Sequence, residues 1–337
     1  MTTIRDIARE SGFSVSTVSR VLAGHRDVSE STAVAIQAVV DRYHFTVNRA
    51  ARNLKQAETM TILVLVKGRH NLLFASMLEH VQAAVTATGY SVAAQYIDED
   101  DNEVAEAERL IAETKPAGVV FLGADADHLV TDADRLGEGC PAVVLTNSVG
   151  TGRAAVSSVT TDDFGAARAA AAYLLDRGHR MLGVIGGNPA VSTISRLRAA
   201  GVQAAVAARG LTFDPATQYA QTRYSLGEGY DAAGWLLDAG PGVTAVYAMS
   251  DIMALGALRA LADRGLGVPA DVSLIGHDGI DLASYVVPKL VTLRQPQETL
   301  ARRGVEILMT HIGGDPTPVE EIVGVDIVEG ESVRTLP

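Results

Sequence analysis

Short, mainly apolar runs alternate with longer amphipathic stretches over most of the chain beyond residue 60. The apolar runs, four to six residues long, predict strands at 62–66, 92–97, 118–122, 142–145, 182–185, 245–248, 272–275 and 290–293. Stretches with helical spacing lie between them, among them 74–88, 104–114, 164–177 and 252–264. Strands that alternate with helices form parallel sheets with helices on both faces. Because the pattern occurs twice, at about 61–150 and about 181–280, it predicts two α/β lobes with a cleft at the carboxyl ends of their strands.

The first 45 residues have a different pattern, that of three short helices. Ile4, Ile7 and Ala8 have the apolar spacing of a first helix, and 16–22 forms the second. Ser29 is a favourable N-cap for the third helix, since its hydroxyl can accept from free backbone N–H groups. The inner face of that helix is predicted to carry Ala33, Ile36, Val40 and Tyr43. Three short helices joined by tight turns predict a helix-turn-helix.

The second of these helices has two distinct faces. At 100° per residue, Val18, Val21 and Leu22 fall on one face, and Ser16 and Arg20 fall on the other. A short polar side chain beside an arginine lets a helix approach base edges, where arginine can bind guanine with two hydrogen bonds. The alternative is a solvated face of a small helical domain, because helix-turn-helix patterns have many false positives.

Charge separates the same two regions. The chain has 337 residues, too many for one ordinary core, and a net charge of −12. Residues 1–59 carry a net charge of +2, whereas residues 60–337 carry −14. A basic head on an acidic body suggests a nucleic-acid module fused to a second function.

Location follows from what the sequence lacks. Cys140 is the single cysteine, so no intrachain disulfide can form. The N-terminus has no apolar signal core, and no apolar run approaches the roughly 20 residues that a bilayer crossing requires. We therefore expect a cytoplasmic protein that does not contact a membrane.

The segment 46–59 joins head to body and is basic, with Arg49, Arg52 and Lys55. Asn48 could cap a short helix that ends near Leu54. Two interpretations stay open: a flexible linker, or a helix that becomes ordered only on DNA.

Signals for an enzyme are weak. The sequence contains no phosphate loop with its glycines, lysine and hydroxyl residue, and no His-Glu-x-x-His zinc motif. The glycines of 183–187 are explained by the end of a strand, and pairs such as Asp162 and Asp163 are too common to indicate acid–base catalysis. We expect no catalytic residues, no metal site and no cofactor.

Several segments resemble the LacI/GalR family of transcriptional regulators. They are Thr3-Ile4-Arg5-Asp6-Ile7-Ala8, Ser14-Val15-Ser16-Thr17-Val18-Ser19-Arg20-Val21-Leu22, Val28-Ser29-Glu30-Ser31-Thr32, Asn48-Arg49-Ala50-Ala51-Arg52-Asn53-Leu54, Arg177-Gly178-His179-Arg180, Ser250-Asp251-Ile252-Met253-Ala254-Leu255-Gly256-Ala257 and Val272-Ser273-Leu274-Ile275-Gly276-His277-Asp278. The resemblance extends over nearly the whole chain.

The resemblance implies an all-α helix-turn-helix headpiece followed by an α/β body of two doubly wound parallel-sheet lobes, like a periplasmic binding protein. It implies a headpiece at 1–46, a hinge helix and linker at 47–59, and an effector-binding and dimerisation domain at 60–337. We expect lobe 1 at about 60–160 and 291–318, and lobe 2 at about 161–290 and 319–337.

For DNA, the resemblance implies that Val15, Ser16 and Arg20 read the major groove and that Leu54 wedges into the minor groove. Such a wedge unstacks a base step and bends the duplex. The full set of expected DNA-binding residues is Thr3, Ser14, Val15, Ser16, Thr17, Arg20, Asn48, Arg49, Arg52, Leu54 and Lys55.

For an effector, the resemblance implies Phe74, Asn147, Asp162, Arg198, Tyr224, Ser250 and Asp278. Arg198 can grip hydroxyls or a carboxylate, and Asp278 can accept from sugar hydroxyls. The alternatives are a loop-capping carboxylate at Asp278 and a lobe-core aromatic at Tyr224. Asn147 stands where many family members have aspartate, and Val202 replaces a common aromatic residue, so the ligand need not be a familiar sugar.

We therefore expect a cytoplasmic, effector-controlled transcription factor. Specifically, we expect a homodimeric repressor that binds a near-palindromic operator in double-stranded DNA. The effector is expected to be a small sugar or a related polar metabolite. Two alternatives remain at this point: a solute-binding protein, opposed by the basic head, and a sugar-modifying enzyme on the same lobes, opposed by the lack of a catalytic constellation.

Overall fold

The computed structural model describes residues 4–22, 29–43, 60–69, 71–136, 140–147, 156–240 and 242–337. The chain divides into two units, Met1–Thr59 and Met60–Pro337. The segment predicted to form the hinge, with Asn48, Arg49, Arg52, Leu54 and Lys55, lies outside the described residues, as does Thr3.

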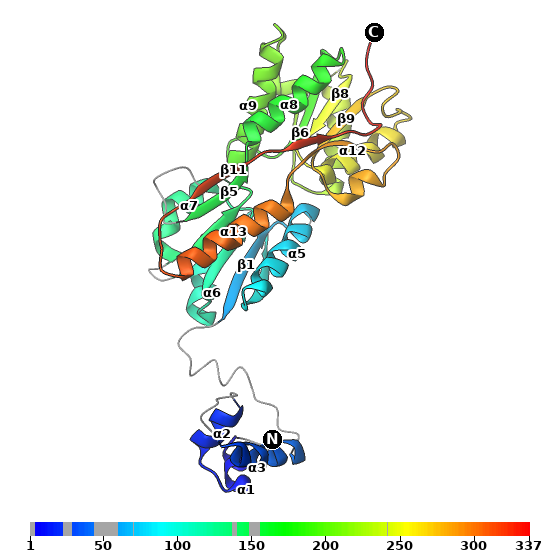
Figure 1. Ribbon diagram of the computed structural model, residues 1–337. Coiled ribbons are helices and arrows are strands. Elements are labelled where there is room, and N and C mark those ends of the chain that lie inside the picture. The colour runs from blue at the N-terminus through cyan, green and yellow to red at the C-terminus, as the bar shows by residue number, and fades with distance from the viewer. Residues whose placement is uncertain are drawn as a thin grey trace. The chain divides into compact units, whose positions relative to one another are not determined.

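The first unit contains the three predicted helices (Figure 1). They are α1 (Ile4–Ser11), α2 (Val15–Leu22) and α3 (Glu30–Arg42). Each helix contributes one fully buried side chain to a common core, namely Ile7, Val18 and Ile36. This core fixes which face of α2 remains outside.

The start of α3 confirms one prediction and its end corrects another. The Ser29 hydroxyl accepts a hydrogen bond from the Thr32 N–H and caps α3 as expected. Tyr43 is 40% exposed, contrary to its predicted place on the inner face. The reason is that α3 ends at Arg42, so Tyr43 leaves the helix direction and Val39 completes the buried face.

Lobe 1 of the second unit has a six-stranded parallel sheet in the order β11-β5-β4-β3-β1-β2. Its strands are β1 (Thr61–Lys67), β2 (Ser91–Ile97), β3 (Gly118–Leu122), β4 (Ala142–Leu145), β5 (Ser157–Thr161) and β11 (Glu320–Val323). Its helices are α5 (Leu72–Ala87), α6 (Glu103–Thr114), α7 (Ala126–Asp132), the 3₁₀ turn η1 (Ala133–Leu136) and α13 (Gln297–Ile312). Helices α5 and α13 pack side by side (Figure 1).

Strand β1 explains why these strands are continuously apolar in sequence. Val64 packs with Met77 of α5 in one core cluster, whereas its neighbour Leu65 packs with Val104 of α6 in another. Successive side chains of a strand point to opposite faces. Both faces are covered by helices, so the five central positions of β1 are all apolar.

Lobe 2 has a second six-stranded sheet in the order β12-β10-β9-β8-β6-β7, parallel except between β10 and β12. Its strands are β6 (Leu182–Gly186), β7 (Tyr219–Gln221), β8 (Ala245–Ala248), β9 (Ser273–Asp278), β10 (Val291–Arg294) and β12 (Asp326–Val328). Its helices are α8 (Asp163–Asp176), α9 (Thr193–Ala207), α10 (Pro215–Gln218), α11 (Leu226–Ala239), α12 (Asp251–Asp263) and the 3₁₀ turn η2 (Asp281–Ser284). Helix α8 packs on α9, and α11 packs on α12.

The chain passes between the lobes three times, and two expected boundaries need correction. Val291–Arg294 pairs with β9 and belongs to lobe 2, although we expected lobe 1 to resume at 291. Glu320–Val323 pairs with β5 and belongs to lobe 1, although we expected lobe 2 to resume at 319. Each segment belongs to the lobe whose sheet it pairs with, and the residues next to it in the sequence do not show which sheet that is.

The structure contains a strand at each of the eight predicted positions. The apolar pattern does not predict β5, β7, β11 and β12, which are short or polar. None of the helices in the described part of the chain combines the length and apolar character needed to cross a bilayer.

Candidate functional site

A cavity of about 470 Å³ lies between the two lobes of the second unit. The carboxyl ends of strands from both sheets supply its walls, with Lys67 and Thr146 in lobe 1 and Gly187 and Asp278 in lobe 2. This is where open α/β sheets bind ligands, and pockets of roughly 300–1,000 Å³ suit small molecules. The cleft predicted from the strand pattern is therefore present.

Five of the seven predicted effector residues line this cavity. They are Phe74, Asn147, Arg198, Tyr224 and Asp278. Asp162 lines a smaller cavity of about 210 Å³ that shares Asn147 with the first. Ser250 lines neither cavity.

Asp162 and Ser250 both cap helices. Oδ1 of Asp162 accepts from the Gly165 N–H at 2.8 Å at the start of α8. Oγ of Ser250 accepts from the Met253 N–H at 3.3 Å at the start of α12. These local contacts account for both side chains, and their contact with an effector stays a prediction.

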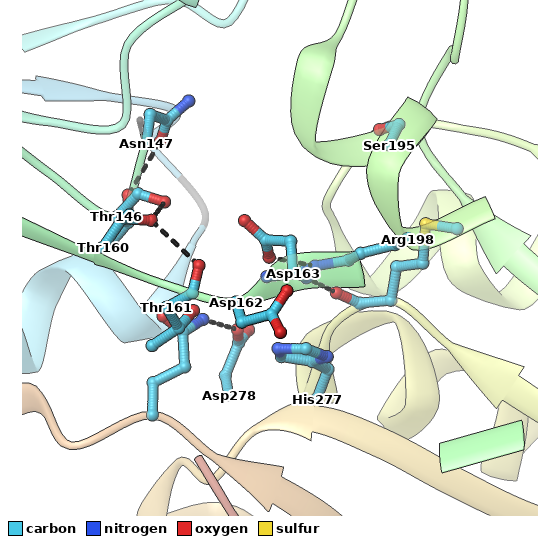
Figure 2. Close-up of polar contacts among 12 residues, drawn as sticks. Thr146, Asn147, Thr160, Thr161, Asp162, Asp163, Ser195, Arg198, His277 and Asp278 are labelled. Atoms are coloured by element: carbon cyan, nitrogen blue, oxygen red, sulfur yellow. Dashed lines mark hydrogen bonds and ion pairs between the residues drawn. The ribbon is translucent and has the colours of Figure 1, made fainter. Parts of the chain in front are cut away.

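Arg198 projects from α9 and is almost fully buried, in an ion pair with Asp163 of α8 (Figure 2). Its Nε lies 2.8 Å from Oδ1 of Asp163, and its guanidinium also donates to the Met249 carbonyl. Burial raises the pKa of the Asp163 carboxyl, although the charge of Arg198 opposes that shift. Arginine has five N–H donors, so these contacts leave others for a molecule in the cavity.

Asp278 ends β9 with φ at 119°, a left-handed conformation that non-glycine residues rarely adopt. Its Oδ1 accepts from Nε2 of Gln295 at 2.9 Å, so the hydrogen bond comes from a side-chain amide instead of a loop N–H. Burial raises the pKa of Asp278 well above its usual range, with the charge of Arg198 opposing and that of Asp251 reinforcing the shift. Backbone strain at a cavity residue commonly marks a functional position.

Tyr224 is a lobe-core aromatic that also lines the cavity, and its contact with an effector stays a prediction. Its hydroxyl lies 3.2 Å from Oγ of Ser195 on α9. Behind this wall the Tyr247 hydroxyl and Nδ1 of His277 are 2.8 Å apart and buried.

In the first unit, two of the predicted DNA-binding side chains lie on the exposed face of α2. Val15 is 44% exposed and Arg20 is exposed, whereas Val18 on the other face is fully buried. Ser14 accepts from the Thr17 N–H at 3.1 Å and so caps α2. The side chain of Ser16 is outside the described part of the chain.

Comparison with known proteins agrees with both units. Residues 3–48 match the bacterial regulatory proteins of the lacI family, and residues 171–333 match a periplasmic binding protein-like domain. The HTH-type transcriptional regulator MalR of Clostridium butyricum is 33% identical over 336 residues, which cover 98% of each chain. The chain belongs to the LacI family of transcriptional regulators.

Solved structures agree with this fold. The transcriptional regulator CelR in complex with cellobiose has a TM-score of 0.73 and 27% identity, covering 98% of this chain and all of its own. The lac repressor dimer bound to operator and an anti-inducer has a TM-score of 0.83 at 23% identity, covering 99% of both chains. A headpiece followed by a two-lobed periplasmic-binding-protein-like core is thus established for this LacI-family protein.

Membership of this family settles the class of function. The chain is a helix-turn-helix, DNA-binding transcriptional regulator with a ligand-binding domain, and the family is not one of enzymes. Among the solved relatives, the lac repressor is a dimer bound to operator, and CelR is bound to cellobiose. The alternative of a sugar-modifying enzyme is therefore wrong.

Sequence reasoning missed several residues that line the cavity of this LacI-family chain. Lys67, Glu99, Arg223 and Gln295 line it but were not among the expected residues. Lys67 carried a usable signal, because it is a lysine at the carboxyl end of an otherwise apolar predicted strand. The other three lie in connecting segments, where no local pattern marks them.

Proposed function

We propose that this LacI-family regulator is a cytoplasmic homodimeric repressor whose operator binding is controlled by a small, neutral, polyhydroxylated effector. The observation that carries the proposal is the interlobe cavity. The guanidinium of Arg198 and the carboxyl of Asp278, both in lobe 2, line this same cavity. A hydroxyl can accept from the first and exchange a hydrogen bond with the second, so this pair suits polyols.

On the DNA side, two headpieces related by a twofold axis would read a near-palindromic operator. The exposed face of α2, with Val15 and Arg20, supports insertion of this helix in the major groove. Leu54 is the proposed minor-groove wedge, in a hinge whose basic residues would contact phosphates.

On the effector side, the relative solved with cellobiose supports a sugar as the ligand class. An effector that contacts both lobes would change their relative orientation and thereby the order of the hinge. Coupling between two such sites is typically about 1–3 kcal/mol, or about 5- to 150-fold in affinity.

A gel-shift titration on the DNA upstream of the protein's own gene tests the repressor role. We expect a specific complex that a short palindromic competitor displaces and that one member of a sugar library weakens or strengthens. Operator binding that no member of the sugar library alters would contradict the proposal. A thermal-shift screen of the same library identifies the sugar independently of DNA.

A further inference from the structure

Lys67 and Glu103 form a buried ion pair in the lobe 1 wall of the cavity. Lys67 is the last residue of β1 and lines the cavity, with its side chain 13% exposed. Its Nζ lies 2.6 Å from Oε2 of Glu103, the first residue of α6, whose side chain is fully buried. Neither residue belongs to the effector set expected from the sequence.

The Glu103 carboxylate is held in place from three directions. Oε1 accepts from the backbone N–H of Asp125 at 2.6 Å, and Oε2 lies 3.2 Å from Nδ1 of His128 as well as close to Lys67. Asp125 and His128 follow β3, and Lys67 ends the neighbouring strand β1, so partners from two strands fix this carboxylate. The carboxylate in turn anchors the ammonium group at the cavity wall.

Packing of the lobe does not require such a pair. Removing two charges from water is costly, and apolar residues of similar volume often stabilise a core equally well or better. The five central residues of β1, Ile62 to Val66, are apolar and pack on both faces. A buried Lys–Glu pair at the carboxyl end of this strand therefore indicates that the pair contacts a ligand in the cavity.

An ammonium group has three N–H donors. Among the residues that the structure describes, Glu103 is the one hydrogen-bond acceptor of Lys67, which leaves two donors at the cavity wall. We propose that Lys67 is an effector-binding residue that donates to a hydroxyl oxygen of a neutral sugar, with Glu103 as its positioning residue. This inference rests on the proposed function and names the lobe 1 contact of the same site.

The charge of the wall selects a neutral ligand. The pair of Lys67 and Glu103 has no net charge. Glu99, Asp100 and Asp125 line the same cavity, and Arg223, which pairs with the first two, offsets only part of their charge. A carboxylate or phosphate would be repelled there, whereas a hydroxyl oxygen needs only the donor. A sugar that contacts Lys67 in lobe 1 and the predicted effector residues in lobe 2 links the two lobes.

The test uses the full chain and isothermal titration with named probes. The neutral probes are D-glucose, D-galactose, D-ribose, maltose and cellobiose, and the anionic probes are D-glucuronate and glucose 6-phosphate. The variants are Lys67→Met, Lys67→Arg and the double variant Lys67→Met/Glu103→Gln, which leaves no unpaired buried charge. Lys115→Met, on an exposed lysine of lobe 1 outside the cavity, is the matched control.

We expect at least one neutral sugar to bind the wild type more tightly than either anion. Its affinity should fall about tenfold or more in Lys67→Met and in the double variant, as for a lost charge-assisted hydrogen bond, and should largely recover in Lys67→Arg. Monodeoxy analogues of that sugar sharpen the test. Removal of the one hydroxyl that contacts Lys67 should cost affinity in the wild type but little further in Lys67→Met.

Three results would overturn the inference: a double variant that binds the sugar within about twofold of the wild type, a wild type that prefers the anions, or one that binds none of the neutral sugars. The first result contradicts this inference alone, whereas the other two also contradict the proposed effector. If the sugar binds through Lys67 but DNA binding is absent or unchanged by it, the proposed function alone fails.

Discussion

Arg223 of lobe 2 and Asp98 of lobe 1 are joined by an ion pair of 2.6 Å across the mouth of the cleft. The same guanidinium lies 2.9 Å from Oδ2 of Asp100 and 3.5 Å from Oε2 of Glu99. Hydrogen bonds from the Asp100 N–H and from Arg223 lower the pKa of the Asp98 carboxyl, so this carboxyl stays ionised at neutral pH. One arginine facing three carboxylates thus holds the two lobes together at this point.

Arg223→Ala should weaken effector binding, because the variant lacks an ion pair that holds the two lobes together around the cavity. Arg223 and Asp98 are each about half exposed, at 47% and 52%, so water and salt screen the pair. We expect a loss of about two- to fivefold at low ionic strength, as for exposed ion pairs. Calorimetric titrations at about 0.01 M and about 1 M salt check this, since screening should bring wild type and variant together at the higher concentration. A loss that does not depend on salt would contradict the electrostatic origin.

Two buried carboxyls, that of Asp278 in the cavity wall and that of Asp251 beside it, predict a pH dependence of folding stability. Burial raises the pKa of Asp251 to about 7, and the neighbouring Asp278 is shifted in the same direction. The folded protein therefore keeps protons that the unfolded chain releases near pH 4. The stabilisation is present at low pH and is lost as pH rises through about 7.

Thermal unfolding between about pH 5 and about pH 8 measures this effect. Asp251→Asn cannot ionise, so its unfolding midpoint should change less with pH than that of the wild type. Asp231→Asn, at an exposed position on α11, should retain the wild-type slope. Parallel curves for wild type and Asp251→Asn would show that Asp251 does not titrate in this range.

The sequence predicts buried strands well and buried polar structure poorly. Gly118–Leu122 has the predicted bounds because both faces are covered and every side chain beyond the glycine is apolar. Ser157–Thr161 is also fully buried, yet its serines and threonines resemble a loop. It is a strand because it lies between β4 and β11. Two of its hydroxyls have buried partners: Ser157 lies 3.3 Å from Nε2 of His311, and Thr160 donates to the Thr146 carbonyl.

The cavity residues divide in the same way. The family motifs predict Arg198 and Asp278 as effector residues, because each of these residues can be recognised from the short segment around it. The partners of these residues come from elsewhere: Asp163 is on another helix, and Gln295 follows the next strand. Such contacts depend on how helices and strands pack, and no periodicity within one segment encodes them.

Base recognition is the prediction for the headpiece. Arg20 lies on the exposed face of α2, opposite the buried Val18. Arg20→Ala should cost about 1–3 kcal/mol on the cognate operator and relax the preference at one base pair in each half-site. A binding-site selection with wild type and variant checks this. Arg42→Ala, on the exposed surface of α3, should retain the wild-type preference, and the same result for Arg20→Ala would rule out base reading by Arg20.

The prediction for Arg198 has to separate stability from effector binding, because this guanidinium serves both. Arg198→Ala leaves Asp163 buried without its partner, and breaking a buried pair costs about 3–5 kcal/mol. The double variant Arg198→Leu/Asp163→Asn removes both charges and should unfold at a higher temperature than Arg198→Ala. Both variants should bind the operator, since the headpiece forms a separate unit, and both should lose most of their response to the sugar. Operator titrations with and without the sugar, alongside thermal unfolding, measure the two effects separately. The contrary outcome is a double variant that regains stability and also keeps a sugar-response midpoint within about twofold of the wild type, far less than the loss of a charge-assisted hydrogen bond would cause. That result would make Arg198 a structural partner of Asp163 and not an effector ligand.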